Sequence, residues 1–131
     1  MYKRQVRACD VFLPSEIEAT ALAGTADLAV AAAAFLDLGP RAVVVKRAEA
    51  GCLVVTRERP EPVVVPTDVV TPVDSTGAGD AFCGAFAVEY LRSGDAHLAA
   101  RIGAATARIA VGGPGVSALL AAVETSSGVP R

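Results

Sequence analysis

The stretch VDSTGAGDAFCGAF, residues 73–86, decides how this chain is interpreted. Gly77 and Gly79 flank Ala78 directly before a long apolar run, which predicts that a helix begins here. Small residues let a ligand approach the backbone closely, and the first N–H groups of a helix lack a partner within the helix. We therefore expect a site for an anion, and for phosphate in particular, formed by Gly77, Ala78 and Gly79.

Asp80 follows these glycines and falls in the first turn of the expected helix. A carboxylate beside an anion hole can accept the proton of an attacking hydroxyl while N–H groups hold a phosphoryl group, and phosphoryl transfer depends mainly on such positioning. The alternative is a glycine-rich turn in which Asp80 is only a favourable charge at a helix start, because a bare G-A-G-D also occurs by chance. No G-K-[ST] follows, so the stretch is not a Walker P-loop.

Outward from this stretch, the pattern predicts alternating strands and helices. Strands are expected at residues 9–13, 42–46, 52–56, 63–65 and 69–70, and helices at 16–22, 26–38, 81–91, 96–111 and 117–123. The first strand–helix–strand unit implies a parallel pair, and the short link at 47–51 implies an antiparallel hairpin. We expect one α/β domain over residues 1–131, with a mostly parallel sheet, helices on both faces, an antiparallel margin and a frayed tail at 125–131.

Local signals mark several helix ends. Ser15 and Glu18 have the spacing of a capping box, with Pro14 before them. Thr25 is expected to cap the second helix and Asp95 a later one. Residues 1–8 are polar and basic and carry no turn or cap signal, so no element is assigned to them.

Composition excludes several classes of function. The chain has a net charge of -2 and no basic block, so we expect no nucleic-acid partner and no membrane association. The apolar run at 28–38 is too short to cross a bilayer, and no apolar segment of a signal peptide follows the basic N-terminus. Three widely spaced cysteines, Cys9, Cys52 and Cys83, fit neither a disulfide framework nor a zinc site, which favours reduced and mostly buried thiols in a cytoplasmic protein.

The full string at 73–86 resembles the second signature of the PfkB/ribokinase family of sugar kinases, and it stands after an edge strand and at the head of a long apolar helix, as in that family. The resemblance implies an ATP-dependent phosphotransferase acting on a hydroxyl of a sugar or sugar derivative, with Asp80 as catalytic base and residues 77–79 as anion hole. It implies ATP and Mg2+ as cofactors, and Asp74 as a ligand of a monovalent cation, usually K+. By itself, Asp74 is equally an N-cap or a turn-forming aspartate.

The segment around Ser15 resembles the N-x-x-E motif of the same family, which helps to organise magnesium and phosphate through water. Glu18 matches the Glu of that motif, whereas Ser15 replaces the Asn and keeps only an oxygen donor and acceptor. Glu18 has a second interpretation as the capping-box partner of Ser15, and both roles can hold together.

The run VVVKRAEAG at 43–51 resembles the strand and loop that touch the nucleotide in these kinases. Lys46 and Gly51 fit the pattern, but Ala48 stands where glycine is usual, and a Cβ there would crowd the nucleotide or change the loop. Lys46 could equally be a surface lysine at a strand end. The segment 104–115 resembles the wall of the adenine site and the loop that gives carbonyls to the cation, although an apolar helix stripe is more often core.

Complete members of this family are longer, and the resemblance lacks the N-terminal half that carries the first glycine-rich signature and the sugar-binding residues. We expect a fragment of a longer kinase, a truncated gene product, or a shortened protein with another role. An uncovered sheet edge would favour a homo-oligomer, a partner or poor solubility. Three hypotheses stay open: a sugar kinase completed by its missing half, a non-catalytic nucleotide-binding module, and a structural or interaction remnant.

Overall fold

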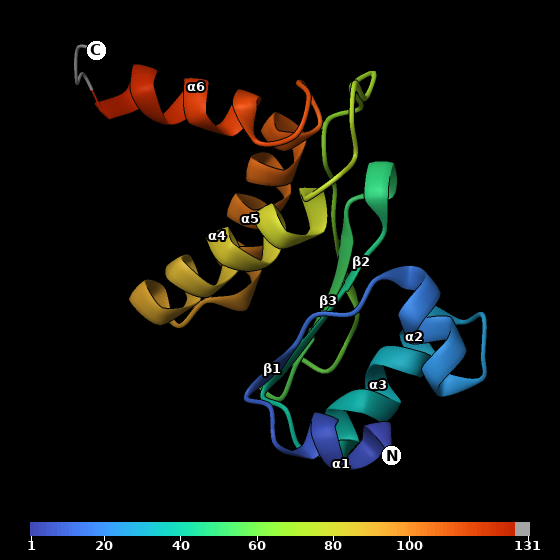
Figure 1. The fold of residues 1–131 in the computed structure, drawn as a ribbon. Helices are drawn as coiled ribbons and strands as arrows, with labels where there is room; N and C mark the ends of the chain where they lie inside the picture. Colours follow the sequence, from blue (N-terminus) through green and yellow to red (C-terminus); the bar gives the residue numbers. More distant parts are fainter. Residues whose placement is uncertain (128–131) are drawn as a thin grey trace. The chain divides into compact units, whose positions relative to one another are not determined.

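The computed structural model describes residues 1–127, and its helices and strands are drawn in Figure 1. The chain groups into two compact units, Met1–Pro66 and Thr67–Arg131, and each is described by itself. The expectation of one domain therefore stays a prediction. The last four residues of the expected frayed tail, 128–131, lie outside the described residues.

The first unit contains a four-stranded sheet and three α-helices. Its elements are α1 (Tyr2–Arg7), β1 (Val11–Phe12), α2 (Glu16–Ala23), α3 (Leu28–Leu38), β2 (Ala42–Lys46), the 3-10 helix η1 (Ala48–Ala50), β3 (Cys52–Thr56) and β4 (Val63–Val65). The strand order is β1-β2-β3-β4, with β1 parallel to β2 and the other two pairs antiparallel. The predicted parallel pair and hairpin are confirmed. Among these strands the sheet is mixed rather than mostly parallel, because the links after β2 and β3 are too short for helical crossovers.

The core of this unit lies between one face of the sheet and its helices, which Figure 1 shows on the same side. Alternate residues of β2 and β3, including Val43 and Val55, pack against small residues of α3 and against Phe35. The ring of Phe35 meets the ring of Phe12 edge-on, with centroids 5.2 Å apart. Within this unit the helices cover one face, so the expectation of helices on both faces stays a prediction.

Helix α1 was not expected, since no sequence signal marks its start and no side chain caps it. Its one buried residue, Val6, enters the core described above, so tertiary packing holds a helix that its own sequence would not. The expected cap of α3 at Thr25 was wrong. Asp27 caps this helix instead, because its carboxylate accepts the N–H groups of Ala29 and Val30 at 3.0 and 3.1 Å.

The second unit is helical in its described part, with α4 (Ala78–Ser93), α5 (Ala96–Ala110) and α6 (Ser117–Ser127). Helix α4 begins three residues before its predicted start, and α6 includes residues 125–127 of the expected frayed tail. The strand expected at 69–70 is absent, because these residues lie between Pro66 and Pro72 and pair with no strand.

Helices α4 and α5 pack closely because α5 presents a stripe of small residues, among them Ala99, Ala100 and Gly103. A Cβ added at Gly103 would lie 3.1 Å from the carbonyl oxygen of Phe82 and 3.2 Å from its ring. Ala104 and Ala110 are also buried, so the core interpretation of the 104–115 segment holds for these two residues.

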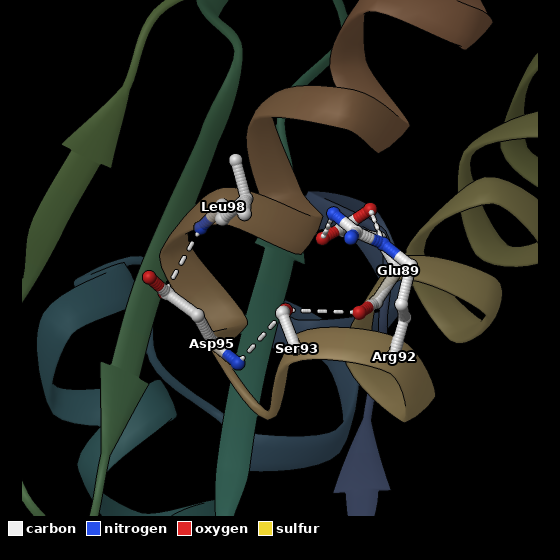
Figure 2. Close-up of polar contacts among 5 residues, drawn as sticks. All are labelled: Glu89, Arg92, Ser93, Asp95 and Leu98. Atoms are coloured by element: carbon white, nitrogen blue, oxygen red, sulfur yellow. Dashed lines mark hydrogen bonds and ion pairs between the residues drawn. The ribbon is translucent and has the colours of Figure 1, made fainter.

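The turn between α4 and α5 is held by a polar network (Figure 2). Asp95 caps α5 by accepting the N–H groups of His97 and Leu98 at 2.9 and 3.0 Å, as the sequence predicted. The Ser93 hydroxyl donates to the carbonyl of Glu89 at 2.9 Å and accepts the N–H of Asp95 at 3.1 Å. These bonds join the end of one helix to the start of the next.

No single helix among residues 1–127 is long and apolar enough to cross a membrane. Within the same residues, only the pair α2 and α3 would together be long and apolar enough, and these two helices are bent by 71° relative to each other.

Candidate functional site

The start of α4 is an open helix N-terminus. Gly77 is its N-cap, with a φ of 78° that favours glycine, and no side chain caps the helix. The N–H of Ala78 donates to Ser75 at 3.2 Å and that of Ala81 to Gly77 at 2.9 Å. Between them, the N–H groups of Gly79 and Asp80 find no acceptor in the part of the chain that the structure describes. Two unpaired N–H groups at the positive end of a helix are suited to a phosphate.

Asp80 lies in the first turn of α4 and is exposed. Within residues 1–127 its carboxylate makes no hydrogen bond and no ion pair, so both oxygens can accept a proton or a hydroxyl group. The predicted neighbours Gly77, Ala78, Gly79 and Asp80 therefore form one local group. A Cβ added at Gly77 would meet nothing within 4 Å, so space is open on that side.

Asp74 is bound on both carboxylate oxygens. Oδ1 accepts the N–H of Thr76 at 2.8 Å, and Oδ2 accepts the N–H of Gly115 at 3.1 Å. The Thr76 N–H, followed by the Gly115 N–H, lowers the pKa of the Asp74 carboxyl. The turn-forming role of Asp74 is thus confirmed, and its role as a cation ligand stays a prediction.

The partners of Asp74 were not expected from the sequence. The carbonyl of Val111 accepts the N–H groups of Val73 and Asp74 at 2.8 and 3.4 Å. Val111 and Gly115 lie about forty residues away along the chain. Two signals pointed to this loop: the glycine-rich GGPG at 112–115, and the resemblance, which implies that the 104–115 segment shares a cation site with Asp74.

In the first unit, Ser15, Glu18 and Lys46 gather where β1 and β2 end. The predicted capping box is present: Glu18 accepts the Ser15 N–H at 2.7 Å, and the Ser15 hydroxyl accepts the Glu18 N–H at 3.2 Å. Ser15 and Lys46 form a parallel bridge, and the Lys46 N–H donates to Pro14 at 2.8 Å. The Ser15 backbone N–H above all, and further the Ser15 hydroxyl and the charge of Lys46, lower the pKa of the Glu18 carboxyl.

A groove beside this cluster is mostly apolar. It is lined by Phe12, Leu13, Pro14, Glu18, Ala21 and Leu22. Such a lining suits apolar atoms rather than a phosphate. The groove therefore gives no support to a phosphate site at Ser15 and Glu18, and the interaction that the structure shows for these two residues is the capping box.

The loop after β2 returns directly to β3. Lys46 pairs with Cys52 across the hairpin, and the Arg47 N–H donates to Gly51 at 2.8 Å. Gly51 has a φ of 77°, and a Cβ there would overlap the carbonyl of Val65, so the loop requires glycine. Ala48, at the position where the resemblance expects glycine, has a φ of 48°. It is the one non-glycine residue with a positive φ in the described chain, which indicates local strain.

Burial affects two polar side chains of this hairpin, Arg47 and Cys52. The Nε of Arg47 is buried and has no hydrogen-bond partner within the described residues. Burial raises the pKa of the Cys52 thiol to about 12, and the charge of Arg47 opposes this only in part. The thiol of Cys52 is therefore neutral and unreactive at neutral pH. All three cysteines are free, but the expectation of mostly buried thiols was wrong, because only Cys52 is buried while Cys9 and Cys83 are partly exposed.

No group of three or more histidine, cysteine, aspartate or glutamate side chains among residues 1–127 is arranged to hold a metal ion. Glu18 and Asp74 each act within their own hydrogen-bonded turn. A Mg2+ ion that enters with a nucleotide commonly uses one or two carboxylates together with phosphates and water, so a single carboxylate such as that of Glu18 fits it.

An open helix N-terminus with an unpaired aspartate beside it, in an α/β chain, is an arrangement suited to binding phosphate. Residues 1–122 match the pfkB family carbohydrate kinases, and the chain belongs to this family. Deoxyribokinase of Salmonella typhi is 37% identical over 121 residues, which cover 88% of this chain and 39% of that protein. The chain spans about two fifths or less of the length of the curated relatives it matches.

Solved structures confirm a partial ribokinase-like fold. An E. coli protein assigned as ribokinase II, in complex with ATP and Mg2+, has a TM-score of 0.77 and 32% identity, over 87% of this chain and 36% of that one. Fructokinase of Vibrio cholerae O395, bound to fructose, ADP and a calcium ion, has a TM-score of 0.81 and 30% identity, over 93% of this chain and 42% of that one.

Proposed function

We propose that this chain is the phosphate-binding and proton-accepting part of an ATP-dependent kinase that phosphorylates a hydroxyl of a sugar or sugar derivative. The observation that carries the proposal is the pair of unpaired N–H groups, on Gly79 and Asp80, next to the free carboxylate of Asp80. Family membership supports a carbohydrate kinase, and the relatives named above are kinases of pentoses and hexoses.

In this proposal the residues of α4 have two roles. The unpaired N–H groups of Gly79 and Asp80, in the anion hole that residues 77–79 form, hold the transferring phosphoryl group and stabilise the charge that develops on its oxygens. The Asp80 carboxylate accepts the proton of the sugar hydroxyl as that oxygen bonds to phosphorus and ADP leaves. Bound Mg2+ would neutralise part of the phosphate charge.

The other predicted residues keep separate roles in the proposal. Lys46 and Gly51 contact the nucleotide, and Gly51 does so through a loop that admits no side chain at its position. Ser15 and Glu18 act on Mg2+ and phosphate through water, which suits a carboxylate already kept ionised by its hydrogen bonds. Asp74 binds a monovalent cation, K+ in the usual case. The sugar substrate, a homo-oligomer or completing N-terminal half, and a cytoplasmic location stay predictions.

A second candidate is a non-catalytic nucleotide-binding module, and two departures from the family pattern favour it. Ala48 strains the loop where the resemblance expects glycine. Ser15, which replaces asparagine, is occupied in the capping box. A structural remnant without a ligand is the third candidate.

Calorimetric titration with MgATP, with and without K+, tests the nucleotide site in the 131-residue chain. We expect binding that weakens at least about tenfold in Gly79→Val, because the added side chain fills the anion hole. Gly84→Val is the matched control, since it adds the same side chain to the same helix away from its N-terminus. Failure of a chain shown to be folded by circular dichroism to bind MgATP would contradict the proposal and favour the structural remnant.

Asp80→Asn separates the first two candidates. Asparagine keeps the N–H groups and the size of the side chain but is a very weak base. In an assembly that phosphorylates a sugar, we expect turnover to fall by about 10²-fold or more while MgATP affinity changes little. Equal turnover in Asp80→Asn and the unsubstituted protein would show that Asp80 is not the base.

A further inference from the structure

The loop before the anion hole is tied to the connection between α5 and α6. Val73 and Asp74 donate their N–H groups to Val111 at 2.8 and 3.4 Å. Oδ2 of Asp74 accepts the N–H of Gly115 at 3.1 Å. These three bonds join segments that are about forty residues apart. The two bonds to Val111 are made by backbone on both sides, and the third joins the Asp74 carboxylate to the backbone of Gly115. The loop that leads to Gly77 thus has its position set by residues 111–115, which we call the α5–α6 connection.

The α5–α6 connection is in turn set by the first turn of α6. Gly113 is buried, and a Cβ added there would lie 3.0 Å from the Cβ of Ala118 and 3.5 Å from its nitrogen. The Ser117 hydroxyl also donates to the carbonyl of Pro114. The start of α6 therefore cannot shift without moving Gly113 and Pro114 or losing these contacts.

The path from Asp74 to the anion hole is short. Oδ1 of Asp74 holds the N–H of Thr76 at 2.8 Å, and the carbonyl of Ser75 holds the N–H of Ala78 at 3.2 Å. Gly77 lies between these two bonds. A displacement of Asp74 is therefore passed through a single hydrogen-bonded turn to the unpaired N–H groups of Gly79 and Asp80.

We propose that Asp74 is a positioning residue that couples the start of α6 to the anion hole through Gly115. Its role in binding rests on the proposed function, whereas the coupling itself does not. The C-terminal helix thereby acts on the anion hole, because its seating against Gly113 decides where the N–H groups of α4 point.

The first test perturbs the far end of the path. Gly113→Ala adds a Cβ that must push against Ala118, while Ala118→Gly in the same chain removes the opposing Cβ. Backbone amide signals are recorded by NMR in a buffer without K+, Na+ or nucleotide. We expect Gly113→Ala to shift the amide signals of Gly115, Gly79 and Asp80, and Gly113→Ala/Ala118→Gly to restore them. Signals of Gly79 and Asp80 that stay unchanged in Gly113→Ala, while the Gly115 signal moves, would overturn the coupling.

The second test breaks the tie at Asp74. Asp74→Asn leaves an acceptor for only one of the two N–H groups, whichever way the amide is turned. We expect hydrogen exchange at the Gly115 or the Thr76 amide to rise about tenfold, and the signals of Gly79 and Asp80 to shift. Asp68→Asn is the control, because it makes the same change of charge at an exposed side chain whose only polar contact among residues 1–127 is a 3.8 Å ion pair with Arg108. Unchanged exchange in Asp74→Asn, or equal effects in Asp68→Asn, would refute the role of Asp74.

These amide measurements decide the inference without any ligand. MgATP titration then asks whether the coupling matters for binding, with an expected loss of about three- to tenfold in both Gly113→Ala and Asp74→Asn and recovery in the Gly113/Ala118 double variant. If the unsubstituted chain does not bind MgATP, the proposed function fails while the coupling stands or falls on the amide signals alone.

Discussion

The carbonyl oxygen of Val65 occupies the space that a side chain on Gly51 would need. This relationship follows from the sheet, because Cys52, the next residue, pairs with Val65 across the β3–β4 ladder. The backbone of the loop after β2 is therefore pressed against the neighbouring strand. The same contact fixes the candidate nucleotide loop, since Gly51 ends it.

Gly51→Ala should be strongly destabilising. The new Cβ overlaps a backbone atom that belongs to a strand, and the φ of 77° is unfavourable for alanine as well. We expect the free energy of unfolding to fall by about 3 kcal/mol or more. Gly24→Ala is the control, because it has a φ of 70° but nothing within 4 Å, so only the backbone cost of about 1 kcal/mol applies. Equal losses in the two variants, measured by urea unfolding, would contradict the overlap.

Ala48→Gly should be stabilising. The φ of 48° is unfavourable for alanine, and this cost slightly exceeds the extra entropy that glycine brings to the unfolded chain. We expect a gain of about 0.5 kcal/mol in the free energy of unfolding. Ala50→Gly, in the same turn but without a positive φ, should lose about 0.5–1 kcal/mol. The two variants should therefore change the free energy of unfolding in opposite directions. A lower free energy of unfolding in Ala48→Gly would show that the loop is not strained.

Gly103 and Gly84 should respond oppositely to alanine. In Gly103→Ala the Cβ meets Phe82 at 3.1–3.2 Å, so α4 and α5 must move apart by a few tenths of an ångström. We expect a loss of about 1–2 kcal/mol. Gly84 lies inside α4 with nothing within 4 Å, so Gly84→Ala should gain about 0.5–1 kcal/mol from helix propensity. Thermal unfolding followed by circular dichroism distinguishes these outcomes, and a stabilised Gly103→Ala would contradict the close packing of the two helices.

Asp95 should make stability depend on acid pH. The N–H of Leu98 above all, helped by that of His97, lowers the pKa of the Asp95 carboxyl from its ordinary value of 3.8. A carboxylate with a lowered pKa stabilises the folded chain above its ordinary pKa, and this contribution is lost as the pH falls through the lowered value. Asp95→Ala should cost about 1 kcal/mol at neutral pH.

The free energy of unfolding, measured from pH 7 down to below the lowered pKa of Asp95, tests this cap. The difference in stability between the unsubstituted protein and Asp95→Ala should shrink as the pH falls below 3.8. Asp95→Asn, an uncharged cap, should retain most of the stability and lose the pH-dependent part. A difference that stays constant down to the acid limb would contradict the cap in Figure 2.

Local signals in the sequence predicted much of the candidate site. The open start of α4, the capping box of Ser15 and Glu18, the cap at Asp95 and the hairpin after Lys46 are all confirmed. Each depends on residues within a few positions of one another, so the information is present in a short stretch of chain. The resemblance to the family likewise rests chiefly on one contiguous signature, residues 73–86.

Other features were decided by residues that are distant in the sequence. Helix α1 exists because Val6 packs into a core, and the strand expected at 69–70 is absent because no strand pairs with it. Position 51 requires glycine because the carbonyl of Val65 in β4 lies against it. The bond between Asp74 and Gly115 likewise joins two segments that are brought together by the packing of α4 against α5, because one precedes α4 and the other follows α5. The sequence by itself thus determined the local hydrogen-bonding motifs and the chemistry they offer. Only the tertiary structure decided which distant groups satisfy the remaining donors and acceptors, because that depends on contacts that no local pattern encodes.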